Sequence, residues 1–148
     1  MSRRGHFHSV LQAEPLAIRQ TLLALRDFFN SNCDAATVDR LELVMAEVLN
    51  NIAEHSHSAT PHARPRRKIR IDVRCRSGGM CCVVMDNGAR IPDACFLPRC
   101  LPPVSDALPD GGFGLCLVRA LAGKVRYARL AGRNLLLLFV PGETSLAA

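Results

Sequence analysis

The chain has 148 residues, of which 49% are hydrophobic and 22% charged, and its formal net charge is +6. These values and a mean hydropathy of +0.11 predict one compact globular domain and exclude an intrinsically disordered chain. The longest purely apolar run, 135–140, is far too short to span a membrane, and the first residues do not resemble a signal peptide. Seven cysteines without recognisable metal-ligand spacing predict reduced thiols in a cytoplasmic protein, and no zinc site.

The first third of the chain predicts a strand followed by two helices. Alternating apolar residues predict a short strand at His6–Gln12. Pro15 stands where the first turn of a helix tolerates proline, and apolar residues at helical spacing continue to about Asn30. Asp34 is a suitable cap for the next helix, which we expect at 35–57.

The remainder predicts two hairpins separated by a long loop and a short helix. The expected elements are a surface loop at 58–67, strands at 69–76 and 80–85, a helix at 114–122, and strands at 125–130 and 135–140. Together they indicate a single α+β domain, a two-layer sandwich with helices on one face of a mixed, mainly antiparallel sheet.

A strongly basic segment lies between the second predicted helix and the strand that follows it. Its cations are Arg64, Arg66, Arg67, Lys68, Arg70, Arg74 and Arg76. The single acid among them is Asp72. Such a cluster favours an acidic partner or nucleic acid, but no aromatic residue interleaves it to stack on bases. A solvated strand face explains it equally well, and we do not expect a nucleic-acid partner.

The helical stretch 41–55 carries the first candidate site residues. Glu47, Asn51 and His55 are spaced four apart, so they form a stripe beside the apolar face of the helix. A solvated helix face would favour Glu–Lys pairs, and this stretch contains no lysine. We therefore expect Glu47 and Asn51 to line a site. His55, near the end of the helix, is expected to be structural or solvated.

Two glycine-containing motifs follow. Asp86-Asn87-Gly88 comes at the end of a buried strand, where a carboxylate accepts a hydrogen bond from an exocyclic amine and glycine lets a flat ring approach. Gly111-Gly112-Phe113-Gly114 precedes a helix, and the backbone N–H groups at a helix N-terminus favour phosphate. Each motif alone is common; their order and separation carry the specificity.

That order resembles the GHKL superfamily of ATPases, and within it the anti-sigma-factor serine/threonine kinases. The segments that carry the resemblance are 46–55 (AEVLNNIAEH), 85–93 (MDNGARIPD) and 111–140 (GGFGLCLVRALAGKVRYARLAGRNLLLLFV). The resemblance implies a histidine-kinase-like ATPase domain over the whole chain, with a lid over the nucleotide at about 95–110.

The resemblance also implies roles for individual residues. Glu47 would be the general base toward the protein hydroxyl that attacks the γ-phosphate, and Asn51 would coordinate Mg²⁺. The residues implied to bind ATP are Asn51, Asp86, Gly88, Arg90, Gly112, Phe113, Gly114 and Leu115. The implied partners are a STAS-domain anti-anti-sigma protein, a sigma factor and a second copy in a homodimer.

Arg90 departs from the family pattern, because it stands where Asp-x-Gly-x-Gly has its second glycine. From there an arginine either contacts phosphate or crowds the lid and weakens nucleotide binding; the sequence leaves both open. The alternative function is therefore a non-catalytic interaction module, either ATP-binding or nucleotide-free, that sequesters a sigma factor or STAS protein. Nucleic-acid binding through 64–76 ranks last, because no groove-reading motif accompanies the charge.

Overall fold

The computed structural model describes residues 5–55, 67–90 and 113–143. Its elements are β1 (His6–Gln12), α1 (Pro15–Asn30), α2 (Ala35–His55), β2 (Lys68–Arg76), β3 (Gly79–Asp86), α3 (Phe113–Leu121), β4 (Lys124–Leu130) and β5 (Arg133–Pro141). The lid expected at 95–110 lies outside the described residues, as does the loop expected at 58–67 except for its last residue.

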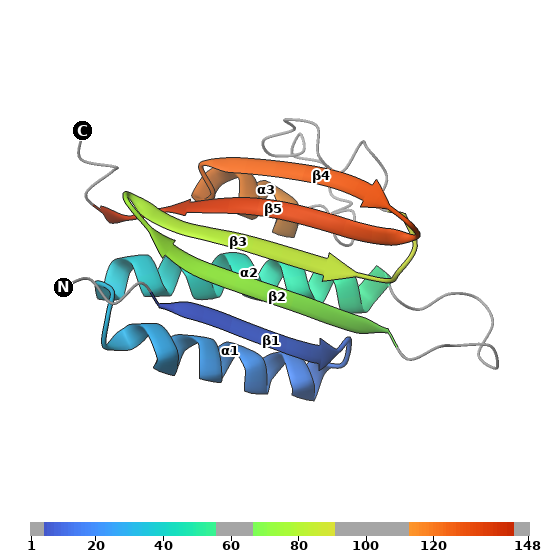
Figure 1. The fold of residues 1–148 in the computed structure, drawn as a ribbon, viewed down its shortest axis with the longest axis horizontal. Coiled ribbons are helices and arrows are strands. Elements are labelled where there is room, and N and C mark those ends of the chain that lie inside the picture. Colours follow the sequence, from blue (N-terminus) through green and yellow to red (C-terminus); the bar gives the residue numbers. More distant parts are fainter. Residues whose placement is uncertain (1–4, 56–66, 91–112, 144–148) are drawn as a thin grey trace, which may run out of the picture.

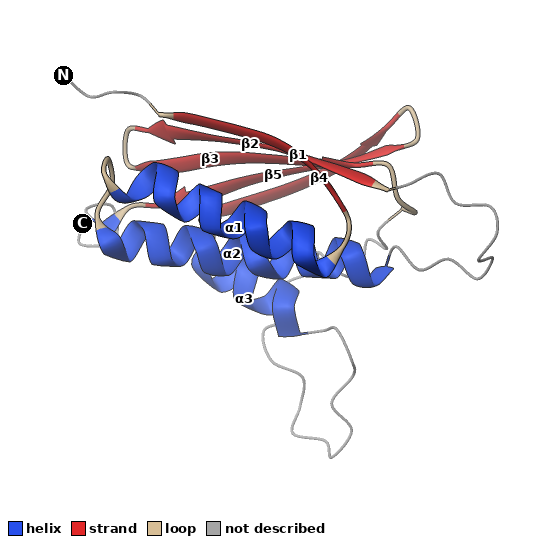
Figure 2. Cartoon of the chain, turned by 90° about the horizontal axis from the view of Figure 1, so that it is seen from below, coloured by secondary structure: helices blue, strands red, loops and turns tan. Residues whose placement is uncertain are grey.

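The predicted two-layer α+β architecture is confirmed. The strands form one open sheet in the order β1-β2-β3-β5-β4, and all four pairings are antiparallel. The three helices lie together on one face of this sheet (Figures 1 and 2). Alternation along each strand therefore divides its side chains between a face toward the helices and an outer face.

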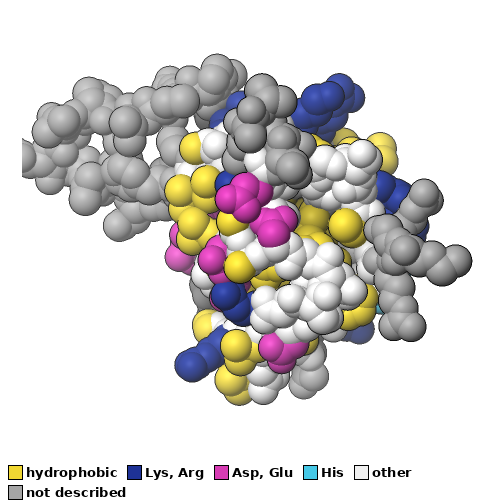
Figure 3. Space-filling view, turned by 90° about the vertical axis from the view of Figure 1, so that its left-hand side faces the viewer, with side chains coloured by type: hydrophobic (Ala, Val, Ile, Leu, Met, Phe, Trp, Pro, Cys, Tyr) yellow, Lys and Arg dark blue, Asp and Glu magenta, His cyan; other side chains and the backbone are white. Residues whose placement is uncertain are grey.

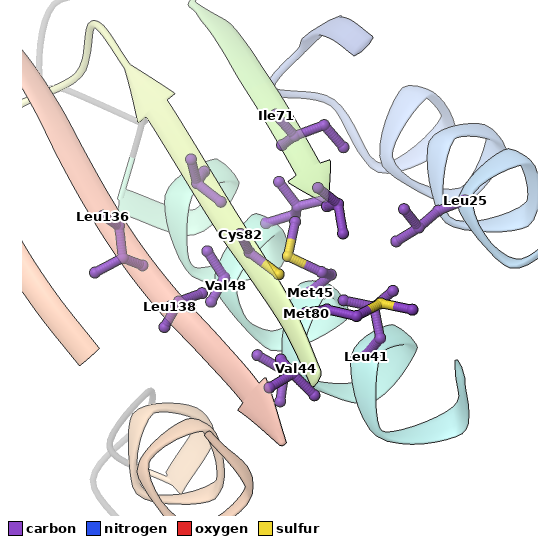
Figure 4. Packing of buried hydrophobic residues seen from close by; sticks show 14 of the residues in the cluster. Leu25, Leu41, Val44, Met45, Val48, Ile71, Met80, Cys82, Leu136 and Leu138 are labelled. Atoms are coloured by element: carbon purple, nitrogen blue, oxygen red, sulfur yellow. The ribbon is translucent and has the colours of Figure 1, made fainter. Parts of the chain in front are cut away.

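The core lies between α2 and the central strands (Figure 4). Leu41, Val44, Met45, Val48 and Leu49 recur at helical spacing and are all buried. They face strand residues at every second position, as expected of strands with one buried face. These strand residues are Ile69, Ile71 and Val73 of β2, Met80, Cys82 and Val84 of β3, and Leu136, Leu138 and Val140 of β5.

The two long helices begin as the sequence predicts, and an ion-pair cluster joins them. Pro15 opens α1 in the first turn. Asp34 caps α2: its carboxylate accepts the Thr37 backbone N–H at 2.9 Å and the Thr37 hydroxyl at 2.8 Å. Arg26 of α1 joins the helices by donating to Glu42 and, at 2.7 Å, to Asp39 of α2. Figure 3 shows the end of the molecule where α2 begins; acidic, basic and hydrophobic side chains are interspersed there.

Both ends of the described chain are held at the β2–β3 turn. The Gly5 carbonyl accepts the backbone N–H of Cys75 at 3.2 Å, and Gly142 N–H donates to the Gly78 carbonyl at 2.8 Å. At the opposite end of the sheet, β3 ends and β5 begins beside the last turns of α2 (Figure 1). The polar residues described below gather at that second end.

The β4–β5 hairpin turns through two residues. Leu130 pairs with Arg133, so Ala131 and Gly132 form the loop. Their φ angles are 50° and 73°, both in the left-handed region that a two-residue type I′ turn requires. The turn places the start of β5 directly beside the end of β3.

Candidate functional site

A buried carboxylate marks the end of β3. Asp86 is 6% exposed, and its Oδ1 accepts the backbone N–H of Gly88 at 2.8 Å and the side-chain amide of Asn134 at 3.1 Å. Burial of a carboxylate is costly unless it is hydrogen-bonded, and these two donors meet that need on one oxygen. Oδ2 accepts no hydrogen bond from the described residues.

Gly88 is required by close packing beside this carboxylate. A Cβ at position 88 would lie 2.7 Å from Asp86 Oδ1 and 3.2 Å from an Arg67 guanidinium nitrogen. Because the first distance is far inside van der Waals contact, any side chain here would displace the carboxylate. The predicted approach of a flat ring to Gly88 stays a prediction; what the structure adds is the tight fit between Gly88 and the carboxylate.

Asn134 belongs to the same cluster and was not predicted as a site residue. It is 2% exposed, and its Nδ2 also donates to the Ala89 carbonyl at 2.8 Å. Its Oδ1 accepts from the Tyr127 hydroxyl and, at 2.8 Å, from Arg129 Nη1. Asn134 therefore connects the carboxylate of β3 to two side chains of β4.

Arg129 closes the cluster from the edge strand. The same Nη1 that binds Asn134 donates to the Gly88 carbonyl at 3.0 Å. The segment after β3 is thus fixed through its backbone at residues 88 and 89 and through the side chain of Asp86. The sequence contains a signal for Asn134. It alternates with the residues of the outer face in the same way as Leu136 and Leu138, so it is a polar residue on the buried face of an apolar strand.

Glu47 and Asn51 lie one turn apart on α2, and both are half-buried. The expectation that they border the apolar face is met, since Val48 between them is buried. The Nδ2 atom of Asn51 is buried and has no hydrogen-bond partner among the described residues. An amide group that is not held by hydrogen bonds to the protein is able to turn its oxygen toward a ligand. Amide oxygen is a normal ligand of hard cations.

The remaining predicted residues are placed less completely. Phe113, Gly114 and Leu115 form the first turn of α3, but their side chains and all of Gly112 lie outside the described residues. α3 packs against α2, in the helix layer that carries Glu47 and Asn51 (Figure 2). Arg90, the last described residue of its segment, is exposed.

A protein-family model matches most of the chain and identifies its family. Residues 11–139 match the model of the histidine kinase-like ATPase domain. The chain belongs to this family. The match includes every predicted site residue, and domains of this family bind ATP. No curated protein sequence matches the chain significantly.

Three solved structures show the same fold as this histidine kinase-like ATPase domain. The chain containing the RsbU and RsbW domains of Rv1364c from Mycobacterium tuberculosis is 16% identical, with a TM-score of 0.61. The histidine kinase domain of the Erythrobacter litoralis EL346 blue-light activated histidine kinase is 19% identical, with a TM-score of 0.53. A second structure of that kinase is also 19% identical, with a TM-score of 0.57.

The matches cover most of this chain and a smaller part of each neighbour. In the same order they cover 93%, 89% and 87% of this chain, and 32%, 62% and 43% of the other chain. The chain is therefore comparable to one domain of these proteins. No helix among the described residues is long and apolar enough to cross a membrane.

Proposed function

We propose that this ATPase domain is an ATP-dependent protein serine/threonine kinase of the anti-sigma-factor type. It would phosphorylate a STAS-domain anti-anti-sigma protein and, by switching between that protein and a sigma factor, regulate transcription in the cytoplasm. The observation that carries the proposal is the pairing on α2 of a half-buried carboxylate, Glu47, with an amide, Asn51, whose nitrogen is buried and unpartnered.

Nucleotide recognition is assigned to the cluster at the end of β3. The Asp86 carboxylate would accept the exocyclic amine of adenine, through Oδ2, because Oδ1 is already held by Gly88 and Asn134. Its fixed position favours binding, since less conformational freedom remains to be lost. Gly88 supports the same role because a Cβ at this position would displace the Asp86 carboxylate.

Asn51 is the residue that would hold Mg²⁺. Its unpartnered amide fits this role, whereas no group of three or more His, Cys, Asp or Glu side chains in the described parts is placed to bind a metal alone. A single amide suits a cation that is bound mainly through substrate phosphates and water. When bound, Mg²⁺ would neutralise phosphate charge during transfer.

Glu47 would act on the protein substrate. Its carboxylate accepts the proton of the attacking serine or threonine hydroxyl, whose oxygen forms the new bond to the γ-phosphorus while the bond to ADP breaks. Phosphoryl transfer depends chiefly on positioning and charge neutralisation, which a residue on a rigid, packed helix supplies. Glu47 is one turn from Asn51, so both groups would address the same phosphate.

The direct test is transfer of labelled γ-phosphate from ATP, with Mg²⁺, to a cognate STAS protein. We expect phosphoserine or phosphothreonine on that protein. Glu47→Gln, which keeps the shape of the side chain, should lower the transfer rate at least 100-fold while ATP affinity changes little. Equal rates for wild type and Glu47→Gln would refute the kinase assignment.

Arg90 supports the second candidate, a non-catalytic module that binds a STAS protein or sigma factor. Calorimetric titration with ATP and Mg²⁺ separates the two. Absence of ATP binding in wild type, with recovery in Arg90→Gly, supports the nucleotide-free module. ATP binding by wild type without phosphoryl transfer to the STAS protein supports the ATP-binding module. The second copy in a homodimer remains part of the proposal, with the edge strand β1 as an available surface.

A further inference from the structure

The outer face of the sheet carries an apolar strip along its two central strands. All described helices lie on the opposite face (Figure 2). β3 and β5 are neighbours, and their outward side chains pair across the sheet at three levels. We call these six residues the outer strip: Cys81, Val83 and Met85 of β3, and Phe139, Leu137 and Leu135 of β5.

The strip is accessible. Leu137, at its centre, is 40% exposed, and the other five residues are half-buried. At the end nearest the β4–β5 turn it opens into a depression of about 300 Å³. The residues lining that depression are Met85, Leu130, Ala131, Arg133 and Leu135.

Basic side chains border the strip on both sides. On β2 the outward residues include Arg70 and Arg74, which pair with Met85 and Cys81. On β4, Lys124 and Arg126 pair with Phe139 and Leu137. All four cations are exposed.

One acid interrupts this border. It is Asp72, and its carboxylate is already engaged by His6 at 2.9 Å, His8 at 3.0 Å and Arg70 at 3.3 Å. Arg70 is paired with this acid, so Arg74 leaves the β2 border with a net positive charge. The face as a whole presents an apolar centre between two positive rims.

The dimensions of this surface match one helix. Two adjacent strands span about 10 Å, which is the width of an α-helix with its side chains. The strip covers residues 81–85 of β3, which extend over about 16 Å, the length of about 11 helical residues. A helix lying along the strip would place residues at both edges of its apolar stripe next to the two basic rims.

We propose that the outer strip is a docking site for an amphipathic helix of a partner protein, with an apolar stripe bordered by Asp and Glu. A second copy of this chain fits poorly because its own net charge is +6. Nucleic acid fits poorly because the centre of the surface is aliphatic except for Phe139. The surface is separate from Glu47 and Asn51, which lie on the helix layer behind the sheet.

A designed peptide tests the proposal without a known partner. The probe is a fluorescent 18-residue helix with a leucine stripe bordered by glutamates, and its counterpart has lysine at each glutamate position. We expect the acidic peptide to bind the full chain at least tenfold more tightly than the basic one. Leu137→Glu and Arg126→Glu should each weaken binding of the acidic peptide at least fivefold.

Matched substitutions on α1 control for net charge. Leu23 is 55% exposed and Arg19 is exposed, so Leu23→Glu and Arg19→Glu make the same charge changes away from the strip. Each should change affinity less than twofold. Equal effects at both places would overturn the proposal, because they would show attraction by net charge alone.

A second measurement needs no variant. A nitroxide on the acidic peptide should broaden the methyl resonances of Val83, Leu135 and Leu137 and leave those of Leu16 and Leu23 sharp. Broadening confined to α1 would overturn the proposal. Binding to phosphatidylglycerol vesicles without binding to the peptide would also overturn it, by indicating a membrane surface instead.

Discussion

The side-chain amide of Asn134 donates a hydrogen bond to the buried carboxylate of Asp86, 48 residues earlier in the chain. The contact joins the start of β5 to the end of β3, which are adjacent and antiparallel. Asp86 is thereby oriented by a neighbouring strand as well as by its own turn. A residue at the start of β5 consequently controls a group that we assign to adenine recognition.

Replacing Asn134 tests whether it orients Asp86 for ATP binding. Asn134→Ala removes one of the two donors to Asp86 Oδ1 and leaves Tyr127 and Arg129 without their shared acceptor. Hydrogen bonds to charged groups contribute about 1.5–3 kcal/mol, so ATP affinity should fall by about 10- to 100-fold. Titration calorimetry measures the change. Leu137→Ala, on the outer face of the same strand, should leave ATP affinity unchanged; an equal loss there would assign the effect to general destabilisation.

Gly88→Ala should impair the same site through sterics. The new Cβ would lie 2.7 Å from Asp86 Oδ1, so the carboxylate or the turn must move. Overpacking of this kind costs about 1–3 kcal/mol, which urea denaturation would measure, and ATP binding should weaken as well. Ala89→Ser, at an exposed neighbouring position, is the control. Unchanged stability and affinity in Gly88→Ala would contradict the packing described here.

The β4–β5 turn offers a stabilising substitution. Ala131 adopts φ 50°, which is unfavourable for alanine and tolerated by asparagine. Ala131→Asn would create the Asn-Gly pair preferred in type I′ turns and should raise the free energy of unfolding by about 0.5–1 kcal/mol.

Substitution of the neighbouring glycine, Gly132, should instead lower stability. Gly132 has φ 73°, and no atom lies within 4 Å of a Cβ built there, so Gly132→Ala tests conformation without a steric clash. It should lower stability by about 1 kcal/mol. Thermal or urea unfolding compares both variants with wild type, and the same sign of change in both would disagree with this turn geometry.

The buried thiol of Cys82 and the half-buried thiol of Cys33 predict a loss of stability at alkaline pH. Burial raises the pKa of Cys82 to about 12, and burial together with the adjacent Cys75 raises the pKa of Cys33 to about 11. Thiols of an unfolded chain ionise near pH 8.5. Between there and the folded-state pKa values, the folded chain retains protons that the unfolded chain has released, so stability falls as pH rises.

Cys82→Ala isolates one of these thiols. In wild type the unfolding free energy falls with pH in this range. We expect this fall to be shallower in Cys82→Ala by about 1 kcal/mol per pH unit between pH 9 and 10.5, measured by urea denaturation. Val84→Ala removes buried volume at the next inward position without removing a titrating group. It should lower stability equally at all these pH values, and an unchanged slope in Cys82→Ala would refute the assignment.

Local sequence patterns predicted the helices and strands, because residues close together in the sequence determine where these elements form. The bounds of β1 and α1 and the cap at Asp34 follow from alternation, helical spacing and one short side chain. Asn134 could not be assigned in the same way, because its role depends on β5 pairing with β3 rather than on the residues beside it. The predicted roles of Gly112 and of the lid at 95–110 stay predictions, as they concern residues outside the described parts.

The binding of both chain ends at the β2–β3 turn has a practical consequence for experiments. Gly5 and Gly142 are fixed to that turn, at the end of the sheet opposite Asp86 and Asn134. A fluorescent protein, affinity tag or surface linker attached directly at Gly5 or Gly142 would start away from the candidate nucleotide cluster. Immobilised or fused forms of this domain should therefore report ligand binding without obstructing it.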